Sequence, residues 1–184
     1  MISSNRTKGV ADSILAGLRT ARSTAISRNS AVRFQLVSSL AAGCVLNRNS
    51  LYWLVTESDQ VAHGNPAGAC NLDPFTPPDQ ADPCNPLPAN YPAGNPDCTV
   101  DPFIVKKSIG SPYLGTSVAA DSAVITFGPL GQLLTNYDGS AKMTTVNISS
   151  TNPDAKSWRI TVKSSGAIKL CDPSATITSP VYCS

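Results

Sequence analysis

Residues 18–37, LRTARSTAISRNSAVRFQLV, contain the change of hydrophobic period that decides the fold. Up to Arg28 the apolar residues recur every three or four positions, as on one face of an α-helix, and from Ala31 to Val37 they alternate as in a strand. The helical stripe begins further upstream and consists of Val10, Ala11, Ile14, Leu15, Leu18, Ala21, Ala25 and Ile26. We therefore predict an amphipathic helix over about residues 5–29, ended by Asn29, with Arg19 and Ser23 on its polar face.

In the rest of the chain, apolar and polar residues alternate with the two-residue period of β-strands. Short alternating runs bounded by turn residues predict strands at 31–37, 51–56, 103–107, 123–127, 143–149, 158–163 and 167–171. Ser164-Ser-Gly166 separates the last two runs and predicts a hairpin. One helix followed by mostly antiparallel strands indicates a single α+β domain over 1–184. We expect the helix in 1–30, the first strands in 31–56 and a C-terminal β region in 103–184.

A segment of unusual composition, residues 57–102, interrupts these strands. It holds ten of the fifteen prolines, three of the six cysteines and seven of the twelve acidic residues, with no Lys or Arg. This density of proline disfavours helices and ladders, so we expect a long irregular loop tied down by disulfides. Asp73, Asp79 and Asp82 could bind calcium only loosely, because their spacing is not that of an EF-hand loop.

The cysteines indicate disulfides rather than a metal site. Their number is even, no two form a CxxC pair, and His63 is the single histidine. A disulfide framework implies the periplasm or the cell exterior, which the low charged fraction of 14% also suggests. We expect a Cys171–Cys183 bridge, since it would close a short loop, and the other pairings stay open. The cysteines are Cys44, Cys70, Cys84, Cys98, Cys171 and Cys183.

Charge and motifs exclude several functions. The net charge is +2, so the whole chain carries no general signal for binding polyanions. Outside 57–102, however, there are fourteen basic and five acidic residues, which is compatible with either a basic face or a mixed solvated surface. No nucleophile elbow, phosphate-binding loop or dinucleotide fingerprint occurs, and His63 lies in a poor setting for a catalytic triad. We expect no enzyme activity, no cofactor and no metal.

Three small residues of the helix, Gly17, Ala21 and Ala25, follow one another at a spacing of four. Such a narrow flank lets another element approach closely. One interpretation is packing of the helix on a sheet of its own domain. The other is a helix–helix interface with a neighbouring subunit.

Three patches of the sequence resemble one family. Leu18 to Arg28 resembles the L-x-x-A-R-S-x-A-I-x-R signature of type IV minor pilins of the FimT/FimU group and of the pseudopilin GspH. Ile125 to Gly131 resembles the strand and turn T-F-x-x-x-G of that family, and Trp158–Cys171 resembles its closing hairpin. The resemblance implies a pilin-like fold with a disulfide-closed end, and a cleaved leader with an apolar half-helix preceding Met1. Residues 1–184 would then be a truncated, soluble form of a protein anchored in the inner membrane before assembly.

The resemblance implies a minor pilin that primes pilus assembly with other minor pilins and the major pilin. It would sit at or near the filament tip, pass from the periplasm to the extracellular pilus, and support twitching or adhesion. One alternative is a minor pseudopilin of a type II secretion system. Another is a DNA receptor for natural transformation, whose G-R-x-R motif corresponds in this sequence to Gly166-Ala-Ile-Lys169, with both arginines replaced. Weak, salt-sensitive contacts to phosphates would then come from Arg159, Lys163 and Lys169, which we expect to share a polar face of the hairpin, with Lys156 nearby.

Overall fold

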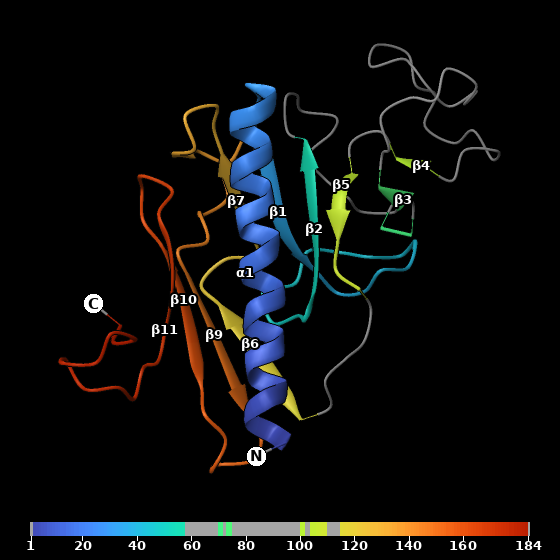
Figure 1. Ribbon diagram of the computed structural model, residues 1–184. Coiled ribbons are helices and arrows are strands. Elements are labelled where there is room, and N and C mark those ends of the chain that lie inside the picture. Colours follow the sequence, from blue (N-terminus) through green and yellow to red (C-terminus); the bar gives the residue numbers. More distant parts are fainter. Residues whose placement is uncertain are drawn as a thin grey trace, which may run out of the picture.

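A long helix, α1 (Ile2–Arg28), runs the length of the domain and packs across two antiparallel sheets (Figure 1). The computed structural model describes residues 2–57, 70–71, 73–74, 100–101, 104–109 and 115–183. Among these residues, no helix combines the length and the apolar character that crossing a bilayer requires. The expected α+β architecture, a helix on antiparallel sheets, is confirmed.

The helix ends as the sequence predicts. Asn29 adopts a left-handed conformation with φ of 50°, which Asn tolerates better than most residues. The N–H of Asn29 donates to the carbonyl oxygen of Ile26 at 3.3 Å, and the N–H of Ser30 donates to that of Ala25 at 3.2 Å. This is a Schellman cap, and it turns the chain from the helix directly into the first strand.

The apolar stripe of α1 forms one side of the core, with one exception. All of its predicted members are buried apart from Ile26, which is 48% exposed. The prediction for Ile26 was wrong because the residue lies in the last turn, beside a groove that no described element fills. The helix is therefore amphipathic as expected, with a narrower apolar face at its C-terminal end.

The first sheet has the strand order β5-β2-β1-β7-β8, with every neighbouring pair antiparallel. Its strands are β1 (Val32–Val37), β2 (Tyr52–Glu57), β5 (Ile104–Lys107), β7 (Val124–Phe127) and β8 (Leu133–Leu134). One face of its centre meets α1, where the rings of Phe34 and Trp53 stack with centroids 5.7 Å apart.

The second sheet has the order β11-β10-β9-β6 and is also antiparallel. Its strands are β6 (Thr116–Ala120), β9 (Thr145–Ser150), β10 (Trp158–Val162) and β11 (Ile168–Cys171). The hairpin predicted at Ser164–Gly166 joins β10 to β11, and Gly166 supplies the positive φ of 79° that its turn requires. Both sheets contact α1, so the helix lies over the seam between them (Figure 1).

All seven predicted strands are present within one or two residues of their predicted ends. Sequence reasoning missed β6 and β8, whose small or short runs carry little periodic signal. It was also wrong to exclude ladders from 57–102, because β3 (Asp73–Pro74) pairs in parallel with β4 (Val100–Asp101). A two-residue pair needs few amide donors, so proline at its end does not prevent it.

Two disulfides join described cysteines. Cys171 bonds Cys183, which confirms the predicted C-terminal loop, and Cys44 bonds Cys70. The second bridge ties the start of the proline-rich segment to the loop after β1. Cys84 and Cys98 lie outside the described residues.

Candidate functional site

The flank of small residues on α1 faces the inside of its own domain. Ala21 and Ala25 are fully buried, and a Cβ built on Gly17 would lie 2.7 Å from Cε2 of Phe34 and 2.9 Å from Cε3 of Trp53. The flank therefore allows the aromatic pair of the first sheet to approach the helix backbone. This geometry corresponds to the intramolecular interpretation, since the sheet covers the flank.

The three sequence patches that carry the family resemblance meet at one junction. Nε of Arg22, on α1, donates to the carbonyl oxygen of Gly131 at 3.1 Å. The N–H of Leu133, just after Gly131, donates to the carbonyl oxygen of Ser164 in the β10–β11 turn at 2.9 Å. The helix signature, the turn after β7 and the closing hairpin are thus held together by polar contacts. Both contacts end on backbone oxygens, and the one at Gly131 depends on the side chain of Arg22.

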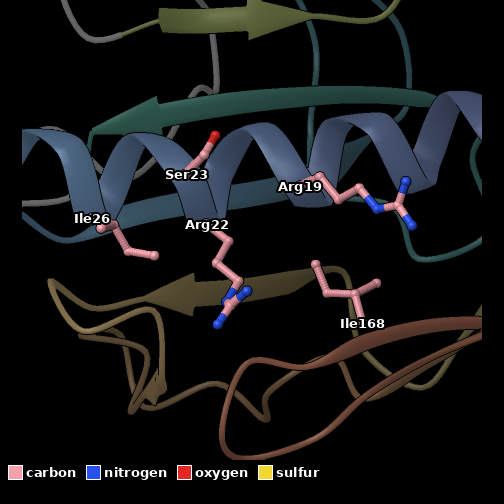
Figure 2. A pocket seen from close by; sticks show the side chains of 5 residues that line it. All are labelled: Arg19, Arg22, Ser23, Ile26 and Ile168. Atoms are coloured by element: carbon pink, nitrogen blue, oxygen red, sulfur yellow. The ribbon is translucent and has the colours of Figure 1, made fainter.

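Beside this junction a groove of about 290 Å³ opens between α1 and β11 (Figure 2). Arg19, Arg22, Ser23 and Ile26 line it from the helix, and Ile168 lines it from β11. In the described part of the chain, neither Arg19 nor Arg22 has a carboxylate within ion-pair distance. The sequence placed Arg19 on the polar face of the helix but gave no signal that β11 lies beside it.

The outer face of the second sheet brings together three of the four proposed DNA-binding cations. In the register of β10 and β11, Arg159 lies opposite Cys171, and Thr161 lies opposite Lys169. Side chains alternate along a strand, and directly opposed residues share a face, so Arg159, Lys163 and Lys169 lie on one side. Nε of Arg159 donates to Oδ1 of Asn147 at 2.7 Å, which holds it over the sheet.

Lys156 does not belong to this face. Its Nζ lies 2.8 Å from Oδ2 of Asp172 and 4.8 Å from the centre of the Trp158 ring, beside the first turns of α1. Thr7 of the helix donates to the carbonyl oxygen of Lys156 at 2.8 Å. Burial raises the pKa of Asp172, but hydrogen bonds from Lys156 and Ser174 outweigh it and the pKa falls below its usual value. Lys156 therefore has a structural partner.

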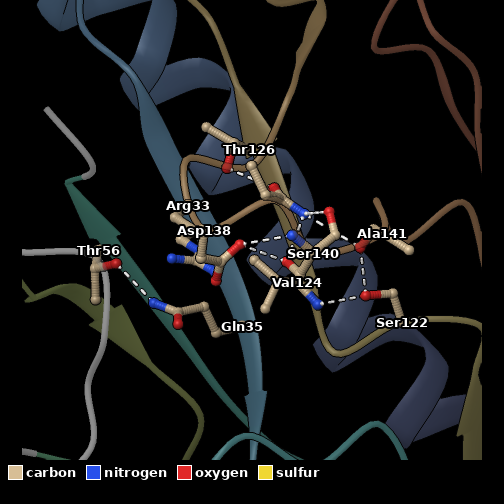
Figure 3. Close-up of polar contacts among 10 residues, drawn as sticks. Arg33, Gln35, Thr56, Ser122, Val124, Thr126, Asp138, Ser140 and Ala141 are labelled. Atoms are coloured by element: carbon tan, nitrogen blue, oxygen red, sulfur yellow. Dashed lines mark hydrogen bonds and ion pairs between the residues drawn. The ribbon is translucent and has the colours of Figure 1, made fainter. Parts of the chain in front are cut away.

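The opposite face of β1, away from the helix, is polar and also buried (Figure 3). Nη2 of Arg33 lies 2.5 Å from Oδ2 of Asp138, and Nε2 of Gln35 donates to Oγ1 of Thr56 at 2.9 Å. Burial alone would raise the pKa of Asp138. Hydrogen bonds from Ser140 and Arg33, together with the charge of Arg33, outweigh this effect, and the pKa falls from 3.8 to about 2. The loop after β8 thus anchors itself on the strand through a buried guanidinium.

No metal-binding cluster of three or more ligating side chains occurs among the described residues. For Asp73 only the backbone is described, and Asp79, Asp82 and His63 lie outside the described residues. Beside the groove and on the outer face of the second sheet, the charged side chains that the structure brings together are cations, which suit anions.

Comparison with known proteins places this geometry in context. The sequence model of the family described as type II transport protein GspH matches residues 10–166. The fold is similar to that of the type IV minor pilin FimU of Pseudomonas aeruginosa (strain PAO1), whose structure in space group P21 aligns with a TM-score of 0.54 and 15% identity over 95% of both chains. Its structure in space group P65 gives a TM-score of 0.51 at 15% identity, over 94% of this chain and 98% of that one. No curated protein sequence matches the chain.

Proposed function

The chain belongs to the GspH family of pilin-like proteins, and from this premise we propose that it is a minor pilin of a bacterial type IV pilus. In this proposal it primes assembly together with other minor pilins and the major pilin, and it sits at or near the tip of the filament. Twitching and adhesion then depend on it indirectly, through the number of pili.

The observation that carries the proposal is the way α1 is held. Thr7 donates to the carbonyl oxygen of Lys156 in the connection between β9 and β10, and at the other end Arg28 forms an ion pair with Glu57 at the end of β2. The helix is thus fixed at both ends to the globular part, and its N-terminal end lies at the margin of the domain (Figure 1). A helical stem that is rigidly attached to a head suits a subunit that packs by its stem in a filament.

Anchoring and location follow from the same proposal. An apolar half-helix preceding α1 would hold the full-length protein in the inner membrane, with the disulfide-bonded domain in the periplasm. Assembly would then carry the domain to the cell exterior. The two described disulfides support an oxidising compartment.

The test is a deletion of the gene in the organism that encodes it, complemented with the full-length gene. We expect fewer surface pili by electron microscopy and reduced twitching, with both restored by the complementing gene. Normal numbers of pili and normal twitching in the deletion strain would contradict the proposal. Secretion of a type II substrate is measured in the same strains. Its loss, with pili unaffected, would favour the pseudopilin alternative that the name of the matched family suggests.

A second candidate function, DNA binding for natural transformation, is favoured by one observation. The register of the second sheet places Arg159, Lys163 and Lys169 on one face, and none of its four strands contains Asp or Glu. Three contacts to phosphates predict weak binding that falls steeply with salt concentration. Lysines in place of a bidentate arginine pair would weaken it further.

Fluorescence anisotropy of labelled duplex DNA, at low and at near-physiological salt, tests this second function. We expect micromolar binding at low salt that a Lys163→Glu/Lys169→Glu variant abolishes. The matched control, Lys106→Glu/Lys107→Glu on β5, makes the same change in net charge at the far edge of the first sheet. Equal losses in both variants, or no binding at low salt, would rule out a dedicated DNA-binding face.

A further inference from the structure

The groove between α1 and β11 combines a strand edge, two cations and two apolar walls. We propose that it docks an extended, acidic segment of another protein. This segment adds to the second sheet along β11 and pairs its carboxylates with Arg19 and Arg22. The proposal concerns a contact of the folded domain and holds whether the filament is a pilus or a secretion pseudopilus.

The first support is the outer edge of β11 at Ile168 and Leu170. This strand is the last in its sheet and pairs with β10, and the C-terminal tail meets its outer side just past Cys171, where Asp172 forms an isolated parallel bridge with Tyr182. The N–H of Lys163 donates to the carbonyl oxygen of Ala167, so residues 167 and 169 direct their backbone groups toward β10. Those of Ile168 and Leu170 consequently point outward, and they have no hydrogen-bond partner in the described part of the chain. Such an edge can accept an additional strand.

The second support is the charge of the groove. Arg19 makes no ion pair with any described residue, and Arg22 uses only Nε, in its bond to Gly131. A guanidinium has five N–H donors in a planar fork, so both side chains keep donors for carboxylates. Both project from α1 on the side that faces Ile168 (Figure 2). An incoming strand at β11 would therefore run beside two cations.

The walls favour a peptide over a nucleic acid. Ile26, 48% exposed, and Ile168 border the arginines with aliphatic side chains. A nucleic acid bound through its phosphates would leave Ile26 and Ile168 uncovered. Its phosphates only accept hydrogen bonds, so they could pair with the N–H groups of β11 but not with its C=O groups. A peptide with Glu at every second position satisfies all three features. Its Glu side chains all lie on the face turned toward α1, where their carboxylates meet the arginines and their aliphatic stems meet Ile26 and Ile168.

A second copy of this chain fits less well. Its acidic segment, residues 57–102, contains ten prolines, which lack the N–H groups that strand addition needs. The described parts of that segment join the chain near β2 and β5, at the other edge of the first sheet from β8. The occupant is therefore a segment of a different protein.

The experiment titrates the ¹⁵N-labelled protein with a synthetic heptapeptide, acetyl-Thr-Glu-Val-Glu-Val-Glu-Thr-amide, at low salt. We expect saturable NMR shifts of the amides of Ile168 and Leu170 and of the Nε groups of Arg19 and Arg22. Two control peptides separate the contributions. One carries Lys in place of Glu, and the other carries N-methylated residues that cannot donate to a strand edge. Neither should shift these signals.

Variants test the role of the cation. Arg19→Glu should weaken peptide binding about tenfold or more, as expected for the loss of a charge-assisted hydrogen bond. The matched control, Lys106→Glu on β5, should change it far less. Arg22 is left unaltered because it also holds the Gly131 loop.

Four results of the titrations would overturn the proposal. They are unshifted Ile168 and Leu170 amides, equal binding of the N-methylated peptide, equal effects of the two variants, and stronger binding of duplex DNA to the same amides. Shifts of these amides that grow with protein concentration in the absence of peptide would show that a second copy occupies the groove, and would equally overturn it.

Discussion

The backbone of Gly166 lies directly against the carbonyl group of Gly131: a Cβ built on Gly166 would fall 1.7 Å from that oxygen. Both glycines have positive φ, 79° and 76° respectively, and Arg22 binds the same oxygen from the helix. The turn after β7 and the tip of the β10–β11 hairpin therefore join the two sheets at a point where no side chain fits. The position of the candidate groove depends on this contact.

Replacing Gly166 by Ala should destabilise the domain by about 3 kcal/mol, since it combines a left-handed conformation with a backbone clash. The matched control is Gly139→Ala. Gly139 also has a positive φ, of 70°, but a Cβ there would meet no atom within 4 Å. This control should lose only about 1 kcal/mol. Urea unfolding of both variants measures the difference, and equal losses would show that the loops separate at little cost.

Gly17→Ala should lower the free energy of unfolding by about 1 kcal/mol. The added methyl group would press on the rings of Phe34 and Trp53, which outweighs the better helix propensity of Ala. Ala16→Leu is the control, because it adds more volume one position away on the exposed side and should change stability by less than about 0.5 kcal/mol. Urea unfolding followed by tryptophan fluorescence checks both. A more stable Gly17→Ala variant would contradict the close packing described above.

The ion pair between Asp138 and Arg33 should make stability depend on pH. The pKa of Asp138 is lowered from 3.8 to about 2 in the folded state. Its contribution is therefore complete above about pH 5 and is lost as the pH falls through 4 toward 2. Asp138→Asn should cost about 2 kcal/mol at pH 7, because it removes the carboxylate that contacts the buried Arg33, and much less near pH 2.

The control for this pH dependence is Asp154→Asn, which removes an exposed carboxylate that has no ion pair among the described residues. Its stability should follow that of the unaltered protein at every pH. A difference between Asp138→Asn and the unaltered protein that stays constant from pH 7 to pH 2 would refute the assignment.

The C-terminal disulfide should hold the tail against the chain just past the end of β11, at Asp172. Cys183→Ser removes a bridge that spans a sequence separation of 12, which is worth about 3 kcal/mol by loop entropy. Hydrogen exchange should accelerate at the N–H of Asp172, which donates to the carbonyl oxygen of Val181 at 2.7 Å. Thr176→Ser, in the same tail, keeps the bridge and serves as control. Unchanged exchange at Asp172 in Cys183→Ser would mean that the tail stays docked without its bridge.

Much of the fold could be predicted because local periodicity was strong. The helix, its Asn29 cap, seven strands and the Cys171–Cys183 bridge follow from patterns within short windows. The strands that were missed, β6 and β8, owe their existence to partners distant in sequence. β6 consists of small residues and is held by its five-residue register with β9.

The candidate sites were less accessible to sequence reasoning. Alternation on β10 and β11 was enough to predict that Arg159, Lys163 and Lys169 share a face. It did not indicate that Lys156 pairs with Asp172. The two residues meet because β11 runs antiparallel to β10, which brings the residue after β11 back beside the residues before β10. The groove lined by Arg19 and Arg22 could not be predicted, because the sequence does not indicate that β11 lies beside α1.

The sequence by itself determined the types of secondary structure, the buried side of α1 and membership of a pilin-like family, because these depend on spacing along the chain. Only the tertiary structure decided which faces are covered. Arg33 and Gln35 occupy the polar positions of β1, yet the loop that carries Asp138 buries Arg33. Gly17 could have met a neighbouring subunit or its own sheet, and the rings of Phe34 and Trp53 occupy that place. Hydrophobic period specifies one face of an element, whereas packing against distant segments specifies what each face meets.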